Sequence, residues 1–432
     1  MDKAIQKLPR VPLTPMQRST FAACFLGWSL DAFDFFLLTL CLRSVAAEFH
    51  ATLPMVAEAI FWTLAMRPVG ALLFGLMAER YGRRPTLMIN VVSFSVFELL
   101  SAFAPSLPLF LLCRALFGIA MGGEWGVGAA LALEVLPADR RGFFSGLLQE
   151  GYVVGNLLAA ALYGLLFPHL HGIGLWTPWR VLFMLGALPA LLAFYLRFKV
   201  EESPAWLASR KAKHKAANQP PLPLAPTTSR RSPLWRYLPS LLFLALLMTA
   251  FTSFSHGTQD LYPTLLEHDY GMKPAMVGLL TVIGNFGALA GGIVCGTLSE
   301  RWGRRRTIVV ASLLAIPMVP LWAGSSSIPL LAIGGFLMQF MVQGAWGVIP
   351  AHLNELSPGP VRATFPGFAY QLGNLLSSKN GVVQATLAAG LFGGRLSPVL
   401  SRTVILVAVV VAGLTARGRE RKGASLTAAE AV

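Results

Sequence analysis

Charged side chains are scarce in this chain of 432 residues. Asp, Glu, Lys and Arg together make up 13% of the sequence, whereas hydrophobic residues make up 55%. The charged share is about half of what soluble domains carry, and the mean hydropathy is +0.62. A soluble fold cannot bury this much apolar surface. The composition therefore predicts a polytopic membrane protein that is surrounded by a lipid bilayer.

The motifs of several other function classes are missing as well. The four cysteines, Cys24, Cys41, Cys113 and Cys295, lie in apolar runs without CxxC spacing. We therefore expect neither a disulfide framework nor a metal site. The sequence contains no Gly-Lys dipeptide and no HExxH motif, which argues against a Walker A nucleotide site and a zinc protease. No cofactor and no enzymatic activity are expected.

Acidic residues are also few, since 20 Asp and Glu face 35 Lys and Arg, for a net charge of +15. In a soluble protein this excess would suggest nucleic acid. In a membrane protein, cations gather in the cytoplasmic loops, so no nucleic-acid partner is expected. The basic segments are the N-terminus, the loops 78–86, 136–142 and 300–307, the segment 199–236 and the tail. We expect both termini to face the cytoplasm, across an inner or plasma membrane.

Apolar runs of about 20 residues predict an all-α protein with twelve transmembrane helices in two six-helix halves. The expected spans are 20–42, 56–78, 86–104, 107–135, 143–167, 178–198, 238–264, 275–299, 307–324, 328–355, 363–391 and 399–416. The eleventh is the weakest, because "SSKNG" interrupts it. The halves are then 20–198 and 238–416, flanked by an N-terminal segment 1–19 and a tail 417–432. The connection 199–237 is rich in Lys, Arg, Pro and Ala and should be a flexible cytoplasmic linker.

A constant spacing relates the two halves. "GLMAERYGRRPT" starts at Gly75 and "GTLSERWGRRRT" at Gly296, an offset of 221 residues. The same offset joins Trp125 to Trp346, and it also joins Glu134, Pro137 and Arg141 to Glu355, Pro358 and Arg362. A constant offset across several loops indicates two copies of one unit. Two parallel halves joined by a linker are typical of transporters whose substrate site lies between the halves.

These motifs resemble those of the major facilitator superfamily. "GLMAERYGRR" is similar to its loop signature G-x-L-a-D-r-x-G-r-r, with Glu79 and Glu300 where Asp is usual. "RALFGIAMGGEWG", from Arg114, is similar to the Arg-Gly pattern of its fourth span. The doubled signature covers the architecture of the whole chain. The resemblance implies a secondary carrier.

A narrower resemblance begins at Ser255. "SHGTQDLYPT" resembles the signature of the sialate/lactate:proton symporter family, which includes lactate and pyruvate permeases. The matching residues are Ser255, His256, Thr258, Gln259, Asp260 and Thr264, and Thr252 stands where the pattern has Asn. "DAFDFF" and "GFAYQLGNL" are similar to the bacterial branch of that family. The resemblance implies proton-coupled symport of an organic monocarboxylate.

Three acidic residues inside the predicted spans are candidates for proton coupling. Asp31 and Asp34 are three residues apart and share one helix face, and Glu124 lies in "GGEWG". Ionisable groups in a span usually face a cavity or a partner, and a carboxylate there can exchange a proton. The alternative for each is a static ion pair, for example between the two aspartates and Arg67.

Arg114 is the first candidate for binding a substrate carboxylate, because a guanidinium offers two parallel donors. The alternative is a packing pair between this arginine and an acidic side chain. Tyr370 and Gln371, in "YQLGN", are further candidates for polar contacts with the substrate.

His256 and Asp260 are four residues apart and share one face of the predicted seventh helix, with Thr258 and Gln259 beside them. Subtracting 221 places Ser255 opposite Asp34, so the seventh span is the counterpart of the first. We predict substrate contacts for His256, Thr258 and Gln259 and proton coupling for Asp260. The alternative is a purely structural outer gate.

The remaining charges repeat in both halves and indicate a gate that closes the cytoplasmic side. They are Glu79, Arg80, Arg83, Glu134, Arg141, Glu300, Arg301, Arg304, Glu355 and Arg362.

Together these features predict a carrier of a lactate-like or pyruvate-like acid and protons, active as a monomer. Sialic acid or an aromatic acid is the alternative cargo, and anion exchange the alternative mode. A transport-like receptor and a channel fit less well, since the predicted tails are short and the gate is repeated.

Overall fold

The structure is a computed structural model, and it describes residues 12–170, 176–188, 190–217 and 234–426. This part of the chain is helical throughout, as predicted, and contains no strand. The helices are α1 (Pro15–Glu48), α2 (Leu53–Tyr81), α3 (Arg83–Ala102), α4 (Leu107–Val135), α5 (Arg141–Gln149), α6 (Gly151–Leu166), α7 (Pro178–Leu185), α8 (Ala190–Lys199), α9 (Pro204–Ala217), α10 (Leu238–Gln259), α11 (Tyr262–His268), α12 (Pro274–Trp302), α13 (Arg304–Ala315), α14 (Val319–Ala323), α15 (Ile328–Leu356), α16 (Phe365–Ser377), α17 (Asn380–Leu391) and α18 (Ser397–Arg417). Five short 3-10 turns, η1 to η5, join some of them.

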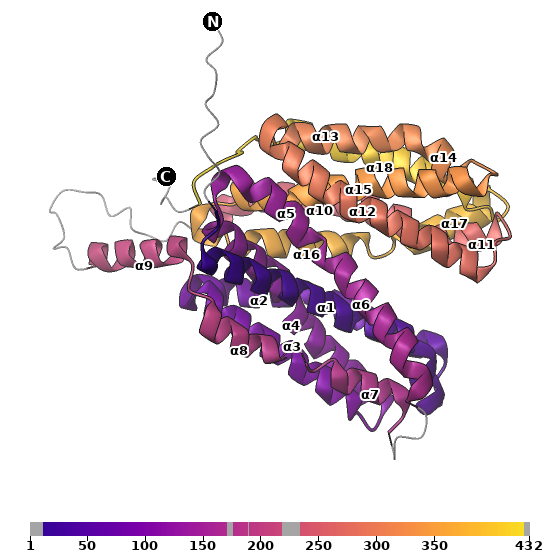
Figure 1. The fold of residues 1–432 in the computed structure, drawn as a ribbon, viewed down its shortest axis with the longest axis horizontal. Coiled ribbons are helices and arrows are strands. Elements are labelled where there is room, and N and C mark those ends of the chain that lie inside the picture. The colour runs from indigo at the N-terminus through magenta and orange to yellow at the C-terminus, as the bar shows by residue number, and fades with distance from the viewer. Residues whose placement is uncertain (1–11, 171–175, 189, 218–233, 427–432) are drawn as a thin grey trace, which may run out of the picture.

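The helices form two bundles, α1–α8 and α10–α18 (Figure 1). The ribbons converge at the end where α1 begins, α18 finishes and α9 projects, and they diverge toward α7 and α11 at the other end. We call the converging end, with residues 79–83, 134–145, 300–305 and 355–364, the closed end. The opposite end is called the open end.

Each of the twelve expected spans is helical, but not all are continuous. Nine helical segments in the described ranges are long and apolar enough to cross a membrane. Five expected spans are divided into helix pairs: α5 and α6 at Glu150, α7 and α8, α10 and α11, α13 and α14, and α16 and α17 at the predicted "SSKNG" interruption. A polar break inside a span is tolerated where protein covers it. The break at Glu150 is buried in this way, since Glu150 is 2% exposed, whereas Ser378 and Lys379 at the break between α16 and α17 are exposed.

Two glycines show how the internal repeat shapes the backbone. Gly82 separates α2 from α3 with φ of 113°, and Gly303 separates α12 from α13 with φ of 93°. Residues with a Cβ rarely adopt this region, so glycine is needed for the sharp turn. The two positions are again 221 residues apart, which explains why both halves carry the same loop motif.

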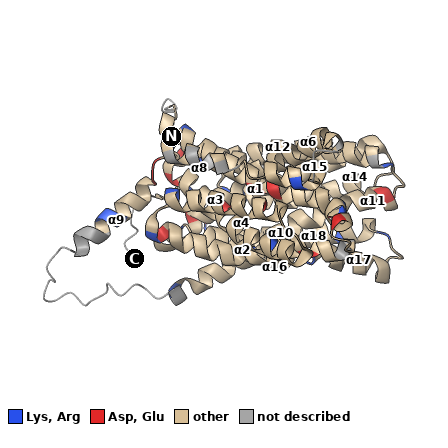
Figure 2. Cartoon of the chain, turned by 90° about the horizontal axis from the view of Figure 1, so that it is seen from below, with Lys and Arg blue, Asp and Glu red and all other residues tan. Residues whose placement is uncertain are grey.

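Apolar side chains cover the outside of the bundles as well as their cores. Large hydrophobic residues such as Leu165, Leu242 and Leu406 are more than half exposed, which suits lipid rather than water. In Figure 2 the helices are mostly uncharged along their length. The expected linker is partly ordered, since Pro204–Ala217 form α9. Residues 1–11, 218–233 and 427–432 of the expected terminal segments and linker lie outside the described residues.

Candidate functional site

The first bundle encloses a cluster of buried charges, which we call the charge cluster: Asp31 and Asp34 on α1, Arg67 on α2, Glu98 on α3, and Arg114 and Glu124 on α4. All are at most 4% exposed. Arg114 Nη2 lies 2.5 Å from Glu98 Oε2, and its guanidinium lies over the ring of Phe117 at 4.0 Å. The structure thus pairs Arg114 with an acidic neighbour, the alternative to substrate binding, and Glu98 is a member that sequence reasoning missed.

The other acidic members of the charge cluster lie close to this pair. Asp34 Oδ1 and Glu98 Cγ both lie 2.9 Å from where a Cβ on Gly186 would stand. Asp34 interacts electrostatically with Glu98 and Arg114, whereas Asp31 interacts with Arg67. The cluster therefore links the two aspartates of α1 to one arginine each.

The charge cluster contains more acids than bases. Four carboxylates face two guanidinium groups, so its full ionisation would leave a net charge of −2. Both carboxylate oxygens of Asp31, Asp34 and Glu124 lack a hydrogen-bond partner among the described residues. A buried, unpaired carboxylate is strongly disfavoured. Neutralising the cluster requires two protons or other cations, which is a property that a proton-coupled carrier can use.

The second bundle places the predicted α10 motif beside two glutamines of α15. His256 Nδ1 lies 3.1 Å from Asp260 Oδ1, and these side chains are 41% and 43% exposed. Gln259 Nε2 donates to Gln339 Oε1 at 2.8 Å, and Gln339 Nε2 donates to the Thr258 hydroxyl at 3.3 Å. This face is neutral apart from the His–Asp pair.

Gln343 extends the same network, because its Nε2 donates to the Ser255 hydroxyl at 3.1 Å. Gln339 and Gln343 were missed from the sequence. Their spacing of four residues inside an apolar helix, the same spacing as His256 and Asp260, is the signal that could have identified them.

Aromatic rings join the two bundles around Tyr370 on α16. Its ring centroid lies 4.7 Å from that of Trp125 on α4, 5.5 Å from Trp346 on α15 and 6.5 Å from Trp28 on α1. Gln371, its neighbour, is 1% exposed and accepts a hydrogen bond from Asn374 at 3.0 Å. These buried rings form a shared wall between the bundles.

At the closed end, the repeated charges pair first within each bundle. Arg83 Nη2 lies 3.2 Å from Glu134 Oε1 in the first bundle. In the second, Arg304 binds both oxygens of Glu355 at 3.0 and 3.1 Å. Of the other predicted gate residues, Arg80 and Arg301 are exposed, and Arg80 lies over the ring of Tyr81.

Other members of the predicted gate connect the bundles. Glu79 on α2 accepts hydrogen bonds from Thr364 N at 3.2 Å and Oγ1 at 2.8 Å, at the start of α16. Glu300 on α12 accepts from the backbone N–H of Gly142 on α5. Equivalent glutamates thus hold equivalent helix starts of the opposite bundle.

The segment after α18 adds a further connection across the closed end. Arg141 of the first bundle donates to Ala424 O at 2.7 Å, and Arg362 of the second donates to Leu426 O at 2.7 Å. Gly423 N donates to Glu355 at 3.2 Å. The closed end is therefore held by side chains, helix starts and the C-terminal segment together.

Glu202, in the connection after α8, covers the start of α3. Its carboxylate accepts hydrogen bonds from the backbone N–H groups of Arg83, Arg84 and Ser203 at 2.8 to 3.4 Å. Burial raises the pKa of the Glu202 carboxyl, and the backbone hydrogen bonds act in the opposite direction. In the second bundle, Glu420 accepts from Arg305 N at 2.9 Å. The turn signature is thus capped by an acid in both bundles.

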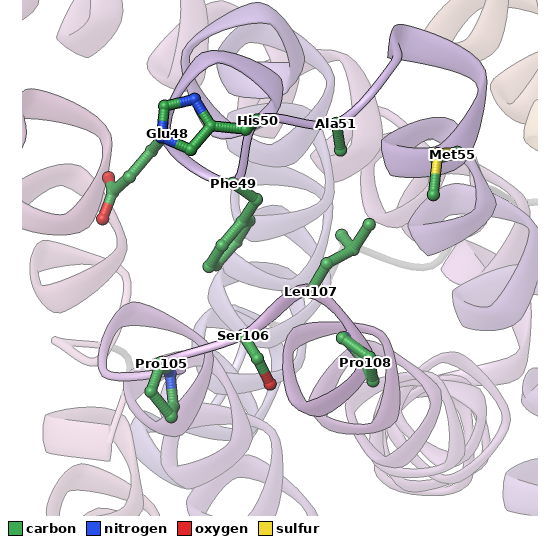
Figure 3. A pocket seen from close by; sticks show the side chains of 9 residues that line it. All are labelled: Glu48, Phe49, His50, Ala51, Met55, Pro105, Ser106, Leu107 and Pro108. Carbon is green, nitrogen blue, oxygen red and sulfur yellow. The ribbon is translucent and has the colours of Figure 1, made fainter.

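A pocket of about 500 Å³ opens elsewhere, between the end of α1 and the starts of α2 and α4 (Figure 3). It is lined by Glu48, Phe49, His50, Ala51, Met55, Pro105, Ser106, Leu107 and Pro108. None of the predicted substrate or proton residues borders it. Glu48 is also held by Arg180 at 2.7 Å. We therefore place the candidate site at the charge cluster and the α10 motif, where both bundles contribute.

Comparison with known proteins agrees with this architecture. Residues 56–219 match the family described as "Sugar (and other) transporter", and residues 260–430 match the "Major Facilitator Superfamily". The chain is 31% identical over 371 residues to the "Probable 4-methylmuconolactone transporter" of Cupriavidus pinatubonensis, covering 84% of this chain and 82% of that protein. It is 28% identical to the "Sialic acid transporter NanX" of Escherichia coli over 88% of this chain and 89% of that one.

Among solved structures, the proton:xylose symporter XylE superimposes with a TM-score of 0.74, covering 96% of this chain and 98% of that chain. The sequence identity is 19%, so this likeness concerns the fold.

Proposed function

Because the chain belongs to the major facilitator superfamily and is a secondary transporter of the membrane, we propose that it couples proton entry to the uptake of a small organic carboxylate. The observation that carries this proposal is the excess of carboxylates in the charge cluster. Two protons would neutralise the cluster, and their loss would leave buried negative charge, so protonation and conformation become linked.

In the proposed cycle, Asp34 or Asp31 takes up a proton while the open end faces the outside. The cargo carboxylate then binds between the bundles. Arg114 can bind the cargo carboxylate directly only if its ion pair with Glu98 is broken. Protonation of Glu98 would release the guanidinium group for this contact. His256, Thr258 and Gln259, with Tyr370 and Gln371 across the gap, supply the remaining polar contacts.

Three cargo classes follow from different observations. The α10 motif resembles that of lactate and pyruvate carriers and favours a small acid. The rings of Trp28, Trp125, Trp346 and Tyr370 favour a flat, unsaturated or aromatic acid, because aromatic rings stack on planar groups. The name of the 31% identical relative, a methylmuconolactone transporter, supports the second class. Sialic acid is the third candidate, supported by the name of NanX.

We assign the closed end to the cytoplasm, because the basic loops, the start of α1 and the end of α18 lie there. The paired charges of Glu79, Arg83, Glu134, Arg141, Glu300, Arg304, Glu355 and Arg362 would then form the cytoplasmic gate, with Arg80 and Arg301 at its rim. The structure would represent an outward-facing conformation of a monomer. Rocking of the two bundles would break the contacts of Glu79 and Glu300 and open the cytoplasmic side.

The test uses purified protein in liposomes with an alkaline interior. Uptake of labelled lactate, benzoate and sialic acid is measured with and without the pH gradient. We expect one of the three to accumulate only with the gradient, and Asp34→Asn to abolish accumulation. Glu58→Gln, the same kind of change at an exposed position of α2, is the matched control.

The variants His256→Ala and Asp260→Asn are measured in parallel. If both leave accumulation intact, the α10 motif is a structural gate. Equal uptake with and without the gradient would instead refute proton coupling and favour exchange.

A further inference from the structure

Glu150 is a buried acid that neither the predicted gate nor the charge cluster includes. It lies between α5 and α6 and is 2% exposed. Neither carboxyl oxygen has a hydrogen-bond partner in the described part of the chain. Its Oε1 lies only 1.9 Å from where a Cβ on Gly292 would stand. The carboxyl group of the first bundle is therefore pressed against the backbone of α12 in the second.

This contact lies in the tightest junction between the bundles. A Cβ on Gly146 would stand 2.2 Å from Gly292 O, and one on Gly142 would stand 2.3 Å from Gly296 O. Glycines on both helices thus bring α5 and α12 into backbone contact. Water has no room between them while the closed end stays closed, and separating the bundles would expose Glu150.

The titratable groups on the helices around Glu150 have other neighbours, although the carboxylates of Asp31 and Glu124 also lack hydrogen-bond partners. Glu300 lies eight residues beyond Gly292 on α12, roughly 12 Å away along the helix. Arg141 contacts the C-terminal segment, and Tyr152 packs on the ring of Trp28. Glu124 lies near the thiol of Cys24, Asp31 near the guanidinium of Arg67, and Cys295 near Gly344. Glu355 and Arg304 pair with each other. His352 on α15 is buried near Arg304 and Arg305. No ion pair with Glu150 forms among the described residues.

We propose that Glu150 is a second proton-binding site of the transport cycle, which must be neutral for the closed end to form. A carboxylate without a partner at a water-free junction is strongly disfavoured, so closure requires the protonated group. When the bundles separate, water reaches the carboxyl group, the O–H bond breaks and the proton passes to that water. Acidification on the side of the closed end would therefore favour closure and turn the carrier toward the opposite side.

This inference rests on the proposed function only for its place in a cycle, and its test needs no cargo. Nitroxide labels at Tyr81→Cys and Trp302→Cys, which are 57% and 48% exposed, report the separation of the two bundles at the closed end. The native cysteines are replaced by serine. Double electron–electron resonance in liposomes then gives the ratio of open to closed molecules between pH 5.5 and pH 8.5.

In the parent, we expect the open-to-closed ratio to rise with pH, by up to about tenfold per pH unit for one linked proton. Glu150→Gln and Glu150→Ala should lose the part of this pH dependence that comes from Glu150, and these variants should stay mostly closed at high pH. Glu150→Asp should retain the pH dependence of the parent. Glu58→Gln should match the parent.

A ratio that is independent of pH in the parent would overturn the proposal, and so would the same pH response in both neutral variants. Failure of the proposed symport would instead appear as absence of gradient-driven uptake in the liposome assay. The two failures are therefore distinguishable.

Discussion

Neutralising the base and neutralising the acids of the charge cluster should change the free energy of unfolding by different amounts. The pair Arg114–Glu98 is fully buried, with 2.5 Å between its atoms. Arg114→Met leaves four carboxylates with one guanidinium group, and no neighbour can replace the missing cation. Breaking a buried pair in this way costs about 3–5 kcal/mol.

Glu98→Gln should cost less, about 1–3 kcal/mol, the penalty for an imperfectly satisfied buried donor. Three carboxylates then face two guanidinium groups. Asp34 lies next to Glu98, so the ionised form of Asp34 can compensate Arg114. Losing an acid lowers the number of protons that neutralise the cluster from two to one, whereas losing a base raises this number from two to three.

The measurement is reversible unfolding in mixed micelles with increasing dodecyl sulfate, followed by circular dichroism at pH 7. The set is the parent, Arg114→Met, Glu98→Gln, the double variant and the exposed control Glu58→Gln. The double variant should be more stable than Arg114→Met, because both partners are gone together. A Glu98→Gln protein as unstable as Arg114→Met, or strictly additive effects, would refute this reasoning.

Three further predictions concern the α10 motif, the turn at Gly82 and the carboxyl group of Glu202. His256→Ala and Asp260→Asn should change the free energy of unfolding by less than about 1 kcal/mol, because their pair is exposed; a larger loss would indicate a structural role. Gly82→Ala should destabilise the fold by about 1–3 kcal/mol in the same micelle assay. An alanine is strained at φ of 113°, and its Cβ would meet Glu202. An unchanged stability would contradict the observed turn. Because the pKa of Glu202 is raised in the folded protein, its protonated form adds stability below the ordinary glutamate pKa, and this stability is lost as pH rises through the raised value. The stability of the parent relative to Glu202→Gln should therefore decrease between pH 4 and pH 8. An increase would contradict the burial of this carboxyl.

The architecture was predictable because lipid imposes simple rules. Span lengths follow from bilayer thickness, and the basic loops predicted at 78–86 and 300–307 contain the two turns at Gly82 and Gly303. The interruption in "SSKNG" was also read correctly, since α16 ends at Ser377 and α17 begins at Asn380. The break between α5 and α6 at Glu150 was not predicted. The apolar run continues on both sides of this residue, and one acidic residue changes the local hydropathy too little to mark a helix end.

The partners of the site residues were much less predictable. Arg114 was recognised as special, but its nearest acid, Glu98, comes from a different helix and could be found only from the packing of α3 against α4. Similarly, Gln339 contacts Gln259 from α15, eighty residues away. Sequence spacing reports neighbours along one helix, whereas each of these pairs joins two helices.

The internal repeat is nearly symmetric in its gate and asymmetric in its interior, and that contrast has a mechanical consequence. Glu79 and Glu300 hold opposite helix starts in the same way, so both bundles resist opening similarly. By contrast, α1 carries Asp31 and Asp34 where α10 carries Thr252 and Ser255. Excess carboxylates are thus confined to the first bundle, and neutral hydrogen-bonding groups line the second. Protonation would change the charge of the first bundle only. Cargo bound between the two bundles would therefore interact electrostatically with that change from one side.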